Sequence, residues 1–240
     1  MLDFARAATV RGMGPLAKAV FVVANALPAP YSTPDVAELR ASERAQFLPK
    51  VAVALESAAE EATCTGRWAV SGCKRRWPGT ASEAASMTLM QGWFESRLDH
   101  RIQAGDCRIW GPKTNQRECD GALYPLGAAP KWERGIRKDT RWGTVVFRSV
   151  TVFQLLGLPD EKRDAVVGLE QENVTAAAQQ ALSVLAGHRG MCRARDWVTC
   201  TISGYAGTMS YRYAPMRAAM FRKIHSRVLS EMKTDAVAAG

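Results

Sequence analysis

The residue with the clearest capacity for acid–base chemistry is Glu95, which stands between Phe94 and Ser96. Apolar residues around it recur at steps of three and four, the spacing of one helical face: Met87, Met90, Phe94, Leu98 and Ile102. Glu95 lies next to this face and would project at the edge of the core. Such a position favours a carboxyl group that keeps its proton, as a general acid must near neutral pH. The alternative is a solvated glutamate on the flank of the helix.

The elements that position this residue can be sketched from the sequence. Ser82 and Glu83 predict the start of the helix, and Gly105 predicts its end. Residues 106–143 lack a sustained period and are rich in Gly, Pro, Arg and Lys, which predicts a long loop or a small β lobe. The β-branched stretch 144–153 is typical of a strand, and it also suits a buried helix.

The composition is that of one globular domain with a basic surface. The chain has 240 residues, 47% of them hydrophobic, which excludes wholesale disorder. The formal net charge of +9 favours a polyanionic partner: nucleic acid, an anionic membrane surface or an acidic cell-wall polymer. Lysine and arginine are scattered from Arg6 to Lys233, so nucleic acid ranks last as the primary ligand. The chain has no apolar run long enough for a membrane span, and we expect no transmembrane segment.

The six cysteines fall into three close pairs: Cys64 and Cys73, Cys107 and Cys119, and Cys192 and Cys200. Bonding within each pair is the simplest disulfide arrangement, because each bridge would close a short loop. It indicates an oxidising compartment. Two alternatives stay open. One is zinc ligation, for which His188 lies four residues before Cys192; the other is six reduced, buried thiols.

An N-terminal arm, residues 1–34, is expected to precede a larger domain, residues 35–240. A helix is predicted from Pro15 to Ala26, followed by the proline-rich linker LPAPYSTP. The apolar run Ala19 to Leu27 could pass for the core of a secretion signal, and it suits a buried or partner-docking helix equally well. We take the arm as the candidate contact with other proteins of an assembly.

Three further helices are predicted. One spans residues 35–63 with a break at Pro49. Another runs from Asp164 to Leu185 and is closed by Gly187. The last, residues 215–233, is expected to present its basic residues to solvent: Arg217, Arg222, Lys223 and Arg227. The segment SGYAGTMSYRY before it is expected to form a glycine-interrupted turn.

Three motifs along the chain can now be set side by side. The first is the pair Glu95-Ser96 on the apolar-faced helix. The second is RSVTVFQ, Arg148 to Gln154, which follows a loop containing GDCR and ECDG. The third is SGYAGT, Ser203 to Thr208. In this order they resemble the lysozyme-like lytic transglycosylases, which include goose-type lysozyme relatives and the cell-wall lytic modules of phages.

The second motif is similar to the family's Gly/Ser-x-x-[Met/Phe/Trp]-Gln element, and the third to its Ala-Tyr-Asn-Ala-Gly motif. This chain departs from both. Thr151 and Val152 stand where the family has a small residue before the aromatic-Gln pair, and no Asn follows Tyr205. The loop between Glu95 and Gln154 is also longer than is usual for the family.

The resemblance implies a mainly α fold, with a lysozyme-like helical domain and a long loop or small β lobe after the catalytic helix. It implies Glu95 as the catalytic acid. Ser96, Gln154 and Tyr205 would position the acid or bind the substrate. If the reaction is hydrolytic, Asp106 or Asp120 is the candidate base, since both follow the acid helix.

The implied activity is cleavage of the β-1,4 bond between N-acetylmuramic acid and N-acetylglucosamine in bacterial peptidoglycan, with 1,6-anhydro ends as products. No cofactor and no metal are expected. The chain would act in a phage virion, where the arm 1–34 would contact other virion proteins, or in the bacterial periplasm or outside the cell. The alternative is a structural virion protein with an inactive lysozyme-like fold. An open groove at Glu95 would favour the enzyme, and an enclosed, paired carboxylate would favour the alternative.

Overall fold

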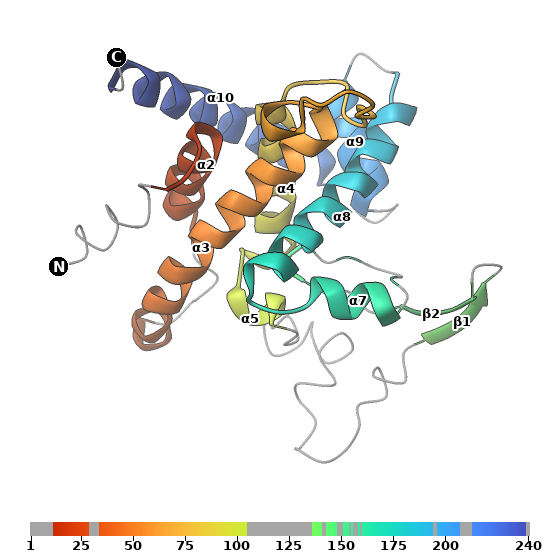
Figure 1. Ribbon diagram of the computed structural model, residues 1–240. Helices are drawn as coiled ribbons and strands as arrows, with labels where there is room; N and C mark the ends of the chain where they lie inside the picture. The colour runs from red at the N-terminus through yellow and green to blue at the C-terminus, as the bar shows by residue number, and fades with distance from the viewer. Residues whose placement is uncertain are drawn as a thin grey trace.

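The computed structural model describes residues 12–28, 34–104, 136–140, 143–147, 151–153, 155, 158, 160–193, 196–206 and 213–238. Within these residues the chain is mainly helical, which confirms the predicted fold class (Figure 1). In the same part of the chain, no helix combines the length and apolar composition that crossing a bilayer requires.

The core is built by helices from both ends of the chain. They are α2 (Pro15–Ala26), α3 (Pro34–Thr63), α4 (Ala81–Ser96), α8 (Gln171–Met191), α9 (Trp197–Ala206) and α10 (Ala214–Ala238). Helix α3 packs against α2, α4 and α8, and α10 packs against α2, α4 and α9 across the upper end of the bundle in Figure 1. Large, fully buried side chains from these helices and the loops between them meet in one cluster: Leu48, Leu55, Trp77, Met87, Leu89, Met90, Phe153, Leu185, Ile202 and Ile224.

Helix α2 has the predicted bounds, with Pro15 at its start. A proline is tolerated there because the first helical N–H has no intrahelical partner in any case. Its apolar side chains belong to the main core, and Val20 and Ala24 are fully buried. The helix of the expected N-terminal arm is therefore a buried helix that packs on α3 and α10.

The predicted break at Pro49 is wrong, because α3 continues through this residue. Proline removes one backbone hydrogen bond from a helix. Here Leu48 and Val51, on either side of it, are fully buried in the core. Tertiary packing of this kind supplies most of the stability of a helix in a folded protein. The helix α3 therefore continues through Pro49 despite the missing backbone hydrogen bond.

The single helix predicted from Asp164 to Leu185 is also wrong. The chain forms α7 (Asp160–Val166) and α8, separated by a turn in which Gly168 adopts φ +135°. The buried Gln103 side chain donates to the carbonyls of Val166, at 2.7 Å, and Gly168, at 3.1 Å. Gly187 does not end α8, which runs on to Met191.

Two predictions near the C-terminus need correction. The expected turn SGYAGTMSYRY is helical over its first part, since α9 extends to Ala206. Its remaining residues 207–212 lie outside the described part of the chain. The last helix is longer than predicted and includes Arg217, whose side chain is not presented to solvent.

A small β hairpin is described near the middle of the chain. Strand β1 (Ile136–Thr140) pairs antiparallel with β2 (Gly143–Phe147), with Ile136 opposite Phe147 and Thr140 opposite Gly143. Residues 105–135, the larger part of the predicted loop or β lobe, lie outside the described residues. Of the stretch 144–153, predicted as a strand or a buried helix, residues 144–147 belong to β2, and residues 148–150 lie outside the described part of the chain.

Two of the three predicted disulfides are confirmed. Cys64 is bonded to Cys73 with 5.9 Å between the Cα atoms, and Cys192 to Cys200 with 5.8 Å. Cys107 and Cys119 lie outside the described residues. Because the sulfur of Cys192 is bonded to another sulfur, the alternative of zinc ligation by this residue does not apply to the structure.

Candidate active site

Three segments that are far apart in the sequence meet at the C-terminal end of α4. The Ser96 hydroxyl donates to the carbonyl of Val152 at 2.8 Å. The Tyr205 hydroxyl, from α9, donates to the carbonyl of the next residue, Phe153, at 2.7 Å. The segment 151–153 is thus held between α4 and α9, and all three motifs contribute to one place in the fold.

Helix α4 begins at Ala81, one residue before the predicted Ser82, and ends earlier than predicted. Thr80 is its N-cap, and Thr80 and Glu83 form a reciprocal capping box. The helix ends at Ser96 and not at Gly105, because Arg97 and Leu98 both adopt left-handed backbone conformations, with φ 57° and 56°. Its apolar periodicity continues only through the short helix α5 (His100–Gln103). Glu95 therefore lies in the last turn of its helix.

The carboxylate of Glu95 is paired and largely enclosed, since only 14% of its side chain is exposed. Its Oε1 accepts from Nε2 of Gln91 at 2.8 Å and from Nη1 of Arg217 at 2.5 Å. Arg217 reaches it from the first turn of α10 and is itself 13% exposed. The prediction that Arg217 faces solvent is wrong, because the start of α10 packs against α4 and buries this face.

Ser96 is buried, and only 2% of its surface is exposed. Besides Val152, the hydroxyl oxygen lies 3.0 Å from the carbonyl of Gly92 and accepts from the backbone N–H of Leu98 at 3.1 Å. The hydroxyl thus joins the last turn of α4, the left-handed turn after it and the segment 151–153.

The left-handed turn after Ser96 is held from a neighbouring helix. Arg44 of α3 donates from Nη1 to the carbonyls of Arg97, at 2.9 Å, and Leu98, at 3.3 Å. These carbonyls lie beyond the last helical hydrogen bonds of α4, and helix ends need such partners. Two consecutive non-glycine residues with positive φ are costly and are found where the surroundings enforce them.

Thr151 has an unusual backbone conformation. Its φ is 67°, a left-handed value that is rare for a β-branched residue and ordinary for glycine. The Thr151 hydroxyl accepts from the N–H of Phe153 at 3.3 Å, a local bond that glycine could not make.

Gly92 permits the close approach of the segment 151–153 to α4. A Cβ atom at this position would lie 2.9 Å from Cε1 of Phe153 and 3.0 Å from Cδ2 of Leu98. Contacts this short do not occur between real atoms without displacement. The absence of a side chain at Gly92 is therefore a condition for the packing that carries the second motif.

The Tyr205 hydroxyl stays protonated at every physiological pH. Burial raises the pKa of Tyr205 above its ordinary range, and the negative charge of Glu95 raises it further, whereas Arg217 acts in the opposite direction. A neutral phenol can only donate its proton to the Phe153 carbonyl, as observed. Tyr205 is thus a fixed donor beside Glu95.

A second guanidinium lies near the ion pair, on two aromatic rings of α4. The guanidinium carbon of Arg97 is 3.9 Å from the ring centre of Trp93 and 5.8 Å from that of Phe94. Arg217 stands 5.1 Å from the same Phe94 ring. Burial lowers the pKa of Arg97, and the positive charge of Arg217 lowers it further. We call these four residues, Trp93, Phe94, Arg97 and Arg217, the arginine–aromatic cluster.

The structure brings together Glu95, Ser96 and Tyr205 of the predicted site. Gln154, Asp106 and Asp120 lie outside the described residues, and their predicted roles are untested. Sequence reasoning missed Arg217, because nothing local distinguishes it from the other basic residues of α10. Gln91 could have been found, since it precedes Glu95 by four residues on the same helical face.

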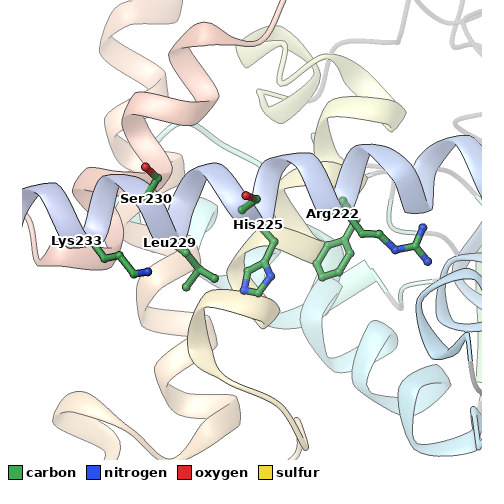
Figure 2. Close-up of a pocket in the computed structure, with 7 residues that line it drawn as sticks. Arg222, His225, Leu229, Ser230 and Lys233 are labelled. Carbon is green, nitrogen blue, oxygen red and sulfur yellow. The ribbon is translucent and has the colours of Figure 1, made fainter.

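A separate hollow of about 440 Å³ runs along α10, and Glu95 is not among its lining residues (Figure 2). Its lining comes from this one helix: Phe221, Arg222, His225, Ser226, Leu229, Ser230 and Lys233. The rings of Phe221 and His225 stack at 5.6 Å. Within the described part of the chain, no three His, Cys, Asp or Glu side chains are grouped so that they could hold a metal ion.

No protein-family model, no curated protein and no solved structure matches this chain.

Proposed function

We propose that this protein cleaves peptidoglycan at the β-1,4 bond between N-acetylmuramic acid and N-acetylglucosamine, as a lytic transglycosylase. One observation supports the proposal above others. The three motifs that resemble this family are separated by about fifty residues each, yet they touch one another around Glu95 through Ser96, Val152, Phe153 and Tyr205.

In this reaction Glu95 gives its proton to the glycosidic oxygen as the bond to C1 of the muramoyl residue breaks and the sugar takes on oxocarbenium character. The carboxylate then removes the proton from the C6 hydroxyl of the same residue. The C6 oxygen closes onto C1, which yields a 1,6-anhydro end and returns Glu95 to its protonated form. No second carboxylate takes part. If water replaces the C6 hydroxyl, Asp106 or Asp120 would act as the base.

The surrounding residues would fix the position of Glu95 relative to the glycosidic bond of the glycan. Ser96 and Tyr205 fix the segment 151–153, and Gln154 follows it directly in the sequence. Because productive geometry must be kept within about 0.5 Å, such positioning groups matter even when they do not touch the substrate. Two disulfides are suited to an oxidising site of action, such as a virion or the space outside the bacterial cytoplasm.

The pairing of Glu95 favours a second candidate function. The contact with Arg217 is one that a carboxylate makes, whereas cleavage needs the protonated acid. A structural virion protein with an inactive fold of this kind would keep Glu95 paired and enclosed in all states. The two candidates make opposite predictions about wall cleavage.

The test is digestion of purified peptidoglycan by the wild type and by Glu95→Gln, with mass spectrometry of the released muropeptides. We expect anhydro-muropeptides from the wild type and a loss of about 100-fold or more in the variant, the usual contribution of a general acid. Glu56→Gln is the matched control, since Glu56-Ser57 is the same dipeptide on α3, where its carboxylate accepts from the Ala17 N–H at 3.1 Å.

Reducing ends in place of anhydro ends would move the assignment to a lysozyme-type hydrolase. Release by Glu95→Gln at the wild-type rate would remove Glu95 from the chemistry. No release by the wild type would leave the structural protein as the better description.

A further inference from the structure

Within the described residues, not every N–H donor of the Arg217 side chain makes a hydrogen bond. Its Nη1 is bonded to Glu95, and its Nε is buried without a hydrogen-bond partner in the described structure. Buried N–H groups of this kind are rare, because an unmade hydrogen bond is costly. A guanidinium presents five N–H donors in a fork that matches a carboxylate. Arg217 therefore has donors to offer to a second acidic group.

The surroundings of Arg217 also favour an anion. Arg97 is the other cation of the arginine–aromatic cluster, and both guanidinium groups lie on the Phe94 ring. Two neighbouring positive charges repel each other, and the charge of Arg217 lowers the pKa of Arg97. An anion that arrives from outside would relieve this repulsion and compete with Glu95 for the same guanidinium.

The proposed reaction requires such a competitor. As long as Arg217 is bonded to Oε1 of Glu95, this oxygen is not available to the glycosidic oxygen. Contact with a carboxylate of the substrate would draw Arg217 away and free Oε1 of Glu95 for the reaction. A neutral glycan would leave the ion pair intact.

We propose that Arg217 is a specificity-determining residue that exchanges Glu95 for a carboxylate of the glycan strand, so that acidic strands are cleaved and neutral ones are spared. This inference rests on the proposed peptidoglycan-cleaving function. In peptidoglycan the carboxylates are carried by the peptide stems, and stem-free strands carry them on the lactyl groups.

The experiment compares intact peptidoglycan with the same material after its carboxyl groups have been converted to amides. Wild-type protein is expected to cleave the acidic form with at least 10-fold higher kcat/KM. Arg217→Gln should lose this preference because its kcat/KM on the amidated form rises. Arg217→Lys keeps the positive charge and should therefore retain part of the preference. Stem-free strands form a third arm, which distinguishes lactyl from stem carboxylates.

The matched control is Arg222→Gln. Arg222 is exposed on the same helix and is paired with Asp196 at 3.2 Å and not with Glu95, so its loss should leave the preference unchanged. An equal fall of Arg217→Gln on both substrates would show a merely structural role and overturn the inference. Cleavage of both forms at equal rates by the wild type would overturn it as well, whether or not the variants fold.

Failure of the proposed function has a different signature. If the wild type released nothing from either substrate, the enzyme proposal would fall and this inference with it. Release without discrimination would overturn the role of Arg217 and leave the enzyme in place.

Discussion

The two ends of helix α4 are closed in different ways. At its start, Thr80 and Glu83 satisfy each other's backbone N–H groups at 3.1 and 2.8 Å, within four residues and near the surface. At its end, the groups that hold Ser96 and Glu95 come from Val152 and Arg217, which are 56 and 122 positions away. The first end also has ordinary backbone geometry, whereas the second has two left-handed residues.

This difference shows which end of α4 depends on distant parts of the fold. A helix start that needs only local chemistry can form wherever its sequence occurs. A helix end that needs buried charges and strained backbone is stable only when the rest of the fold is assembled around it. Such arrangements gather at functional sites because they hold reactive groups in conformations that local preferences alone would not select.

The largest effect is expected from Gly92→Ala. The added methyl group would overlap the Phe153 ring and Leu98. We expect a loss of about 2 to 3 kcal/mol in the free energy of unfolding, as for overpacked cores, in spite of the better helix propensity of alanine. Cleavage of peptidoglycan should also fall, because a displaced Phe153 would shift Gln154, the next residue and a proposed site residue. Chemical denaturation and the muropeptide assay measure the two effects.

Gly187→Ala is the control for this substitution. Gly187 lies within α8, and a Cβ atom there would meet nothing within 4 Å. This variant should gain about 0.5 to 1 kcal/mol from helix propensity alone. A gain in stability by both variants would contradict the close packing of Phe153 against Gly92.

The next prediction sets the two ends of α4 against each other. Ser96→Ala leaves the buried N–H of Leu98 and the carbonyl of Val152 without their partner, and we expect it to cost about 2 kcal/mol. Thr80→Ala removes an exposed N-cap and should cost about 1 kcal/mol. Only Ser96→Ala is expected to reduce cleavage. Equal costs, with cleavage intact in both, would contradict the contrast between the two ends.

The smallest effect concerns the left-handed conformation of Thr151. Thr151→Gly and Thr151→Ala both remove the hydroxyl and the methyl group, so their difference isolates the backbone. At φ 67° the glycine variant should be more stable than the alanine variant by about 1 kcal/mol. Thermal or urea unfolding of the pair measures this. A more stable alanine variant would show that residue 151 does not adopt the left-handed conformation.

Several elements could be predicted because their signals are local. Apolar periodicity and a proline at the first position predicted the bounds of α2, and Ser82 with Glu83 predicted the start of α4 to within one residue. The disulfides Cys64–Cys73 and Cys192–Cys200 follow from short separations along the chain. The order of the three motifs also singled out Glu95, Ser96 and Tyr205, which do lie together.

The errors fall where distant segments outweigh local preference. Pro49 should interrupt a helix, yet core packing on both sides carries α3 through it. Periodicity predicts that α4 continues to Gly105, yet the chain turns at Arg97 because Ser96 and Arg44 satisfy its backbone groups from the side. Arg217 resembles its exposed neighbours in sequence and is enclosed only because α10 meets α4.

The amino-acid sequence therefore specifies most of the helical segments, the capped start of α4, the short disulfide loops and the presence of a candidate acid. Each of these depends on residues within about one or two helical turns, or within one short loop, of each other. The exposure of that acid, its partner Arg217 and the conformation of Thr151 are set by packing between segments about 50 to 120 positions apart. Such contacts leave no local periodicity to detect, because the side chains that make them are brought together only when the core forms.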